Sequence, residues 1–127
     1  MLLFFLLVLN HLAFTTLNLY RLKAEYLVSQ NRILRAAEVV KWDYKYQFIA
    51  GLLALSARQY EVAIFYNRRV AVLFPWNFDA INNMAVAYGA LGDGEKARLL
   101  FLAILDLYPS HSEAKKNMEM MGGKWTQ

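Results

Sequence analysis

Few residues of this chain have the types and spacing that chemistry requires. The only histidines, His11 and His111, lie near opposite ends of the sequence and are not at the spacing of metal ligands. The chain has no cysteine, which excludes disulfides, thiolate metal sites and a cysteine nucleophile. Catalysis needs nucleophiles, acids, bases or a metal that converge on one point. We therefore expect no enzyme activity, no bound metal and no cofactor.

The other polar motifs are weak. Gly92-Asp93-Gly94 lacks the length and the Lys-Ser/Thr of a phosphate-binding loop, so we interpret it as a turn between helices. The 14 basic and 10 acidic residues give a net charge of +4 and are interspersed along the chain. A nucleic-acid-binding protein concentrates its basic residues on one face, with aromatic rings for stacking. We therefore expect no nucleic-acid partner.

The first twenty residues form a hydrophobic segment without a charged side chain. Twenty helical residues span about 30 Å, the thickness of a bilayer core. The beginning of the segment is apolar on all sides, which disfavours a surface helix with one wet face. We predict that residues 1–20 form a transmembrane helix in contact with lipid. Its most apolar part consists of Leu2, Leu3, Phe4, Phe5, Leu6, Leu7, Val8 and Leu9.

Two other interpretations of this segment stay open. A cleaved signal peptide would need a basic start and a small-x-small cleavage site, and the segment has neither. A buried helix of a soluble domain is the other alternative, favoured by the polar residues Asn10, His11 and Asn18. If the segment spans a membrane, the positive-inside rule predicts a single-pass protein with the rest of the chain on the cytoplasmic side. The basic residues that follow are Arg21, Lys23, Arg32 and Arg35, against Glu25 alone.

The rest of the chain repeats with a period of 34 residues. Residue types recur at this spacing in several independent places. The matching pairs are Trp42-Asp43-Tyr44 with Trp76-Asn77-Phe78, Ala63 with Ala97, Pro75 with Pro109, and Asn83-Met84 with Asn117-Met118.

This pattern resembles the tetratricopeptide repeat family. Residues 78–111 carry the family's small, aromatic and proline positions at Asn83, Met84, Ala85, Tyr88, Gly92, Ala97, Phe101 and Pro109. Residues 44–77 follow it less closely, with Gly51, Tyr60, Ala63 and Pro75 in place but Ala54 and Arg58 where the family prefers Tyr and Gly. Residues 23–40 look like the second helix of a degenerate repeat, in which Lys41 replaces the proline.

The resemblance implies an all-α fold, a solenoid of antiparallel helix pairs preceded by a single hydrophobic helix. We expect a transmembrane helix over 1–20, a connecting segment over 21–43, a repeat domain over 44–121 and a flexible tail over 122–127. The repeat domain would comprise repeats 44–77 and 78–111 and a half-repeat 112–121. The expected helices are 2–20, which could continue into 23–40, then 44–57, 60–74, 78–91, 94–107 and 112–121.

Repeats of this family stack so that the first helix of each pair lines a concave groove. The resemblance therefore implies a partner-binding groove, mixed in charge and partly apolar, which suits a helix or an extended segment. Its lining would be Lys45, Phe48, Leu52, Leu55, Asp79, Asn82, Val86, Glu113 and Lys116. Some family members clamp acidic chaperone tails with Lys, Arg and Asn. Only Asn83 matches that clamp here, so we interpret Asn83 as a structural hydrogen-bonding residue.

Aromatic residues gather at the expected corners between repeats, namely Trp42, Tyr44, Tyr46, Trp76 and Phe78. We favour packing between repeats as their role, with a membrane-interface or partner contact as the alternative.

The sequence thus predicts a non-catalytic, membrane-anchored scaffold that binds a protein partner, as an accessory subunit of a membrane complex. Two alternatives remain. Repeats after a hydrophobic helix, with Pro-Trp-Asn corners, are also similar to the C-terminal region of polytopic O-antigen ligase and polymerase-type glycosyltransferases. A soluble repeat adaptor is the third interpretation.

Overall fold

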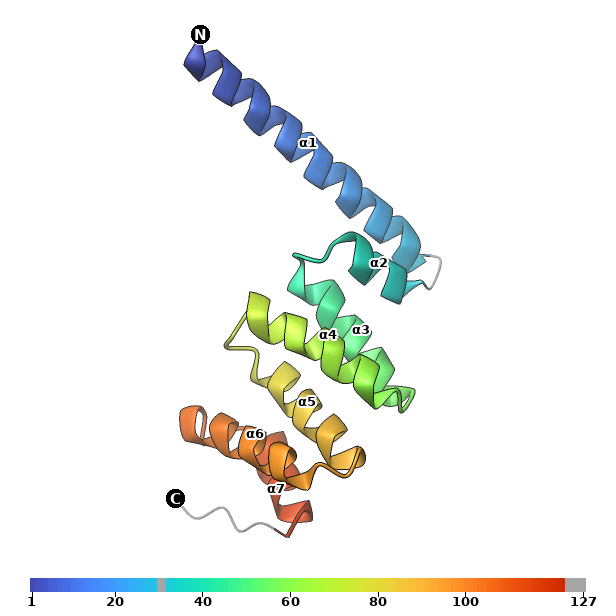
Figure 1. Ribbon diagram of the computed structural model, residues 1–127, viewed down its shortest axis with the longest axis vertical. Coiled ribbons are helices and arrows are strands. Elements are labelled where there is room, and N and C mark those ends of the chain that lie inside the picture. Colours follow the sequence, from blue (N-terminus) through green and yellow to red (C-terminus); the bar gives the residue numbers. More distant parts are fainter. Residues whose placement is uncertain (30–31, 123–127) are drawn as a thin grey trace.

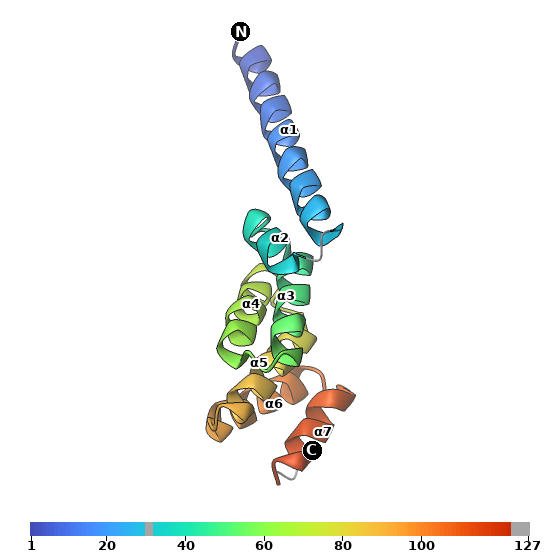
Figure 2. The same cartoon turned by 90° about the vertical axis from the view of Figure 1, so that its right-hand side faces the viewer.

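The structure, a computed structural model, describes residues 1–29 and 32–122, and this part of the chain is entirely α-helical (Figure 1). A long first helix projects from a body of six shorter helices (Figures 1 and 2). The helices are α1 (Leu2–Ser29), α2 (Ile33–Val39), α3 (Tyr44–Ser56), α4 (Tyr60–Leu73), α5 (Phe78–Ala90), α6 (Gly94–Leu107) and α7 (Ser112–Met120). The predicted all-α class, with an apolar N-terminal helix and packed helix pairs, is confirmed.

The first helix continues past residue 20, a possibility that the sequence left open. No break occurs at residue 20, and α1 continues to Ser29. Arg21 and Glu25 form an ion pair of 3.1 Å one turn apart, which stabilises the helix beyond the apolar segment. The single helix predicted over 23–40 is therefore wrong, because its first part belongs to α1 and only Ile33–Val39 forms α2.

The C-terminal end of α1 packs on α2, and the rest of α1 makes no comparable contact with the other described helices. The contact is a small apolar cluster whose members are at most 8% exposed. It consists of Ala24, Leu27, Ile33, Ala36 and Val40.

From α3 to α7, each helix packs on the next one. The largest apolar cluster lies in the C-terminal half of the body, around Phe101, which is 1% exposed. Ala63 and Ala97 are fully buried, as the sequence predicted for the small positions of the helix pairs. Small side chains allow the helices to approach closely, and larger ones fill the remaining space.

The 34-residue period recurs in the backbone at three corners, which join α2 to α3, α4 to α5, and α6 to α7. In each corner the first residue after the turn donates its backbone N–H to the carbonyl three residues earlier, at 3.0–3.1 Å. That residue is Asp43, Asn77 or His111, and its side chain then caps the next helix by accepting a backbone N–H. The first corner keeps this geometry although Lys41 stands where the other corners have proline.

The turns on the opposite side of the body repeat as well. Arg58 has φ 58° and Gly92 has φ 88°, so both residues lie in the left-handed region. The following residues, Gln59 and Asp93, donate their N–H groups to the Ala54 and Tyr88 carbonyls at 2.8 and 2.9 Å. These bonds close the ends of α3 and α5 in the same way.

Candidate functional site

The first helices of the pairs lie together on one face of the body. Helix α3 contacts α5 and α5 contacts α7, whereas α4 and α6 are not in contact among the described helices. The stack is therefore tighter on the side of α3, α5 and α7. All the residues expected to line a groove lie on these three helices.

Helix α3 contributes the more apolar part of this face. Leu52 is 44% exposed, Lys45 is also exposed, and Phe48 and Leu55 are half-buried. Their neighbours Ile49 and Leu53 are 44% and 46% exposed, and the sequence did not single them out. Helix α3 thus presents apolar side chains on more than one flank, a pattern that a single amphipathic stripe would not predict.

Helices α5 and α7 are joined by two polar contacts on the same face. The Asn117 side-chain amide donates to Asn82 Oδ1 at 3.1 Å. His111 Nε2 lies 3.3 Å from Asp79 Oδ1, and His111 Nδ1 accepts the Ala114 N–H at 3.2 Å. Because Nδ1 accepts, Nε2 carries the proton that points to Asp79.

Because of these contacts, some residues predicted to line the groove are buried and others are exposed. Asn82 is 3% exposed, so its side chain is not available to a partner in solvent. Its hydrogen bond to Asn117 joins α5 to α7 instead. Its neighbour Asn83, which we expected to be structurally hydrogen-bonded, is half-buried and makes no side-chain hydrogen bond within the described residues. Glu113 and Lys116 on α7 are exposed.

A cleft of about 340 Å³ opens between α5 and α7. Val86, a predicted groove residue, lines it together with Gly89 and Asn117. Met120 and Met121 line the cleft from the end of α7, and their side chains are 76% and 42% exposed. Flexible thioether side chains adapt to the shape of an apolar partner.

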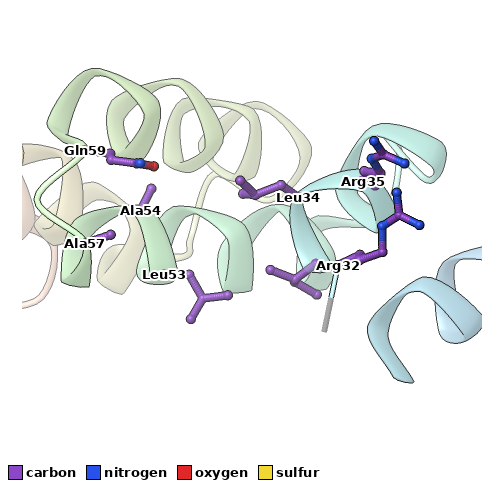
Figure 3. A pocket seen from close by; sticks show the side chains of 8 residues that line it. Arg32, Leu34, Arg35, Leu53, Ala54, Ala57 and Gln59 are labelled. Carbon is purple, nitrogen blue, oxygen red and sulfur yellow. The ribbon is translucent and has the colours of Figure 1, made fainter. Parts of the chain in front are cut away.

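A second cleft of about 340 Å³, which we did not predict from the sequence, lies between α2 and α3 (Figure 3). Leu53 and Ala54 line it from α3 and Ala57 from just after that helix, while Arg32 and Arg35 lie toward its other end (Figure 3). It could not be anticipated because it depends on how α2 packs along α3.

A polar network ties α2 to the first helix pair. Gln47 is fully buried, and its Nε2 donates to the Ala37 carbonyl at 2.6 Å, at the end of α2. Arg69 Nη1 donates to Glu38 Oε1 at 2.7 Å, and the Tyr66 hydroxyl donates to the same oxygen at 3.2 Å. Partial burial raises the pKa of Glu38. Its contacts with Arg69, Tyr66 and Lys41 together lower the pKa by a larger amount, so the pKa of Glu38 lies below its usual value. Burial and the Glu38 carboxylate raise the pKa of Tyr66.

The described residues contain no group of three His, Asp or Glu side chains that could hold a metal ion. His11 lies exposed on α1, and both ring nitrogens of His111 are engaged in the contacts described above. The geometry offers surfaces and clefts for binding.

Helix α1 is long and apolar enough to cross a membrane over Leu2–Leu27, and it alone meets this condition among the described helices. From Leu2 to Leu9 its side chains are between 40% and 74% exposed. No protein-family model matches the sequence, and a search of curated proteins finds no match either.

Proposed function

We propose that the protein is a membrane-anchored scaffold of the tetratricopeptide repeat type, which binds a protein partner as an accessory subunit of a membrane complex. The observation that carries the proposal is the exposure of α1. Removing a large apolar side chain from water stabilises it by about 1.5–3 kcal/mol, and none of the residues from Leu2 to Leu9 is buried by the body. A bilayer supplies the missing cover along the apolar segment of the helix.

Two of the polar side chains inside α1, both threonines, are compatible with lipid. The hydroxyls of Thr15 and Thr16 both donate to the Leu12 carbonyl, at 2.9 and 2.7 Å. Hydroxyls bonded within their own helix leave no unsatisfied donor in an apolar medium. Arg21 and Lys23 follow the apolar segment directly, which supports placing the body on the cytoplasmic side.

The repeat assignment rests on the agreement between residue pattern and backbone. The 34-residue recurrence extends to the corner hydrogen bonds, the helix caps and the left-handed turn residues. Repeats of this family use the face of the first helices to hold a segment of another protein. Here that face combines Phe48, Leu52 and Val86 with charged residues at its edges, which suits an amphipathic helix or an extended segment.

The test is to express the full chain with a tag in its host membrane, to extract it in mild detergent and to identify co-purifying proteins by mass spectrometry. We expect a stoichiometric membrane partner that is lost when Phe48→Asp and Leu52→Asp are combined. The matched control combines Val62→Asp with Leu99→Asp, which place the same charges on exposed positions of α4 and α6. This control should retain the partner.

Three results would count against the proposal. Recovery of the chain in the soluble fraction without detergent contradicts the membrane anchor. A mature protein that lacks the first residues identifies α1 as a cleaved signal. Equal loss of the partner in both double variants contradicts the groove on the first helices.

A further inference from the structure

The three corners between repeats share a property that packing alone does not require: their aromatic side chains are strongly exposed. Trp42 is 49% exposed, Phe74 41%, Trp76 66% and Tyr108 46%. We define these four residues as the aromatic edge. Figure 1 shows the three corners on one side of the body, at the left in that view. The turns on the other side, around Arg58 and Gly92, carry no aromatic residue.

Part of the aromatic content is explained by packing. Tyr44 packs on Phe74 with ring centroids 5.1 Å apart, and Phe78 packs on Tyr108 at 5.8 Å. These two contacts are equivalent by the 34-residue period and hold successive corners together. Trp42 and Trp76 are also equivalent to each other by the 34-residue period. Neither takes part in these two contacts, and both side chains face outward.

The aromatic edge is continuous with the apolar segment of α1. The Trp42 ring meets the Tyr20 ring edge-on, with centroids 5.8 Å apart. Tyr20 is the last residue before Arg21, so the first corner lies at the level where α1 changes from apolar to charged. The N-terminal half of α1 leans over the same side of the body as the three corners (Figure 1).

A cleft of about 750 Å³ separates α1 from the first corner and α3. Phe14, Leu17 and Ile49 give it apolar walls, and two basic residues, Arg21 and Lys45, line it together with two acidic ones, Glu25 and Asp43. The apolar walls of the cleft therefore continue from α1 to α3, with balanced charges beside them.

We propose that the aromatic edge lies in the headgroup region of the same bilayer that α1 crosses, so that the body rests along the membrane. This inference builds on the proposed membrane anchor. Trp and Tyr are the side chains that concentrate at membrane–water interfaces, because their rings combine apolar area with a polar group. The face of α3, α5 and α7 then remains open to a partner, with one flank at the membrane surface.

Fluorescence quenching by lipids brominated near the carbonyl end of their acyl chains tests the inference on the full chain in phosphatidylcholine vesicles. The edge reporter keeps Trp76 alone, through Trp42→Phe and Trp125→Phe. The control reporter adds Leu91→Trp to a background in which all three tryptophans are phenylalanine, because Leu91 is 43% exposed in the turn on the opposite side. An anchor reporter carries Phe5→Trp in the same background.

We expect roughly twofold quenching of Trp76, as for an interfacial ring, clear quenching of the Phe5→Trp reporter and none of the Leu91→Trp reporter. Quenching of the anchor reporter without quenching of Trp76 overturns the edge contact and leaves the anchor intact. An unquenched anchor reporter contradicts the membrane anchor and the edge contact together. Equal quenching of Trp76 and the Leu91→Trp reporter shows that the body has no preferred edge, which also overturns the inference.

Discussion

The two repeats, residues 44–77 and 78–111, have equivalent backbone structures but different side chains in their interiors. At two interior positions the second repeat is apolar, with Ile81 half-buried and Phe101 1% exposed. The equivalent positions in the first repeat are Gln47 and Asn67, and both are fully buried. The geometry of the helix pair therefore does not depend on an apolar side chain at each of these positions.

The polar interior of the first repeat follows from its neighbour. Gln47, Tyr66 and Arg69 make contacts with α2, whereas Ile81, Leu100 and Ala103 occupy their places in the second repeat. A short helix of seven residues offers little apolar surface, so hydrogen bonds and an ion pair hold it. The comparison teaches that the first repeat is specialised to join α1 and α2 to the rest of the body.

The largest expected difference between the repeats concerns Phe101 and Asn67. Phe101→Ala removes a buried ring from the main apolar cluster and should cost about 3–5 kcal/mol. Asn67→Ala removes one hydrogen bond to the Ala63 carbonyl at 2.8 Å, together with a buried Oδ1 that has no partner. We therefore expect a loss of about 1 kcal/mol or less. Urea unfolding of the full chain in lipid nanodiscs, monitored by circular dichroism, measures the free energy of unfolding of both variants. Equal losses of stability in the two variants would contradict the comparison.

The second difference concerns the small residue that faces this position. A Cβ at Gly51 would overlap with the Asn67 side chain, whereas the second repeat accommodates Ala85 at the equivalent place. Gly51→Ala should destabilise the protein by about 1–3 kcal/mol through overpacking. Combining Gly51→Ala with Asn67→Ala should restore most of this loss, because the overlapping group is gone. If the double variant is as unstable as the sum of the single variants, the overlap is not the cause.

The third difference lies in the left-handed turns. Gly92→Ala places a Cβ at φ 88° in open space, so backbone strain alone should cost about 1–2 kcal/mol. Arg58→Gly removes the same strain from the first repeat and should stabilise it by about 0.5–1 kcal/mol. Thermal unfolding of the two variants checks the signs, and a destabilising Arg58→Gly would show that the arginine side chain outweighs the strain.

The smallest effect is a pH dependence at the contact between α2 and the first repeat. The pKa of Glu38 is lowered in the folded protein, so its contribution is present above the unfolded pKa of about 4.3. That contribution is lost as the pH falls through the folded pKa. Wild type should exceed Glu38→Gln in stability at neutral pH, and the difference should shrink below about pH 4. Glu119→Gln, at an exposed position of α7, is the control for the loss of one carboxylate when unfolding midpoints are measured across this range. If the two variants differ from wild type in the same way, the contacts of Glu38 are not the cause.

The regular part of the fold could be predicted from the sequence because each recurring residue acts locally. Pro75, Pro109 and Gly92 mark helix ends by backbone geometry alone, and the helices predicted between them match the structure to within a residue or so. The end of α1 and the start of α2 could not be predicted in this way. They depend on the Arg21–Glu25 pair and on the packing of Leu27 against Ile33, which are tertiary or surface contacts.

Helices α3, α5 and α7, which carry the residues predicted to line a groove, do contact one another in that order, whereas the groove itself stays a prediction. Individual side chains were harder to predict. The sequence could not show that Asn82 pairs with Asn117 while Asn83 does not, because adjacent helical positions differ only in the direction they face. Residue 122 follows α7 with φ 74°, and the rest of the tail expected over 122–127 lies outside the described residues.

The buried Gln47 has a mechanical consequence. Its hydrogen bond to the Ala37 carbonyl and the Arg69–Glu38 ion pair join α2 to α3 and α4. Helix α2 also packs on the C-terminal end of α1. If α1 crosses the membrane as proposed, its tilt in the bilayer sets the orientation of the whole body. Because the tilt of a membrane-spanning helix depends on bilayer thickness, membrane thickness then helps to set the direction in which the proposed groove faces.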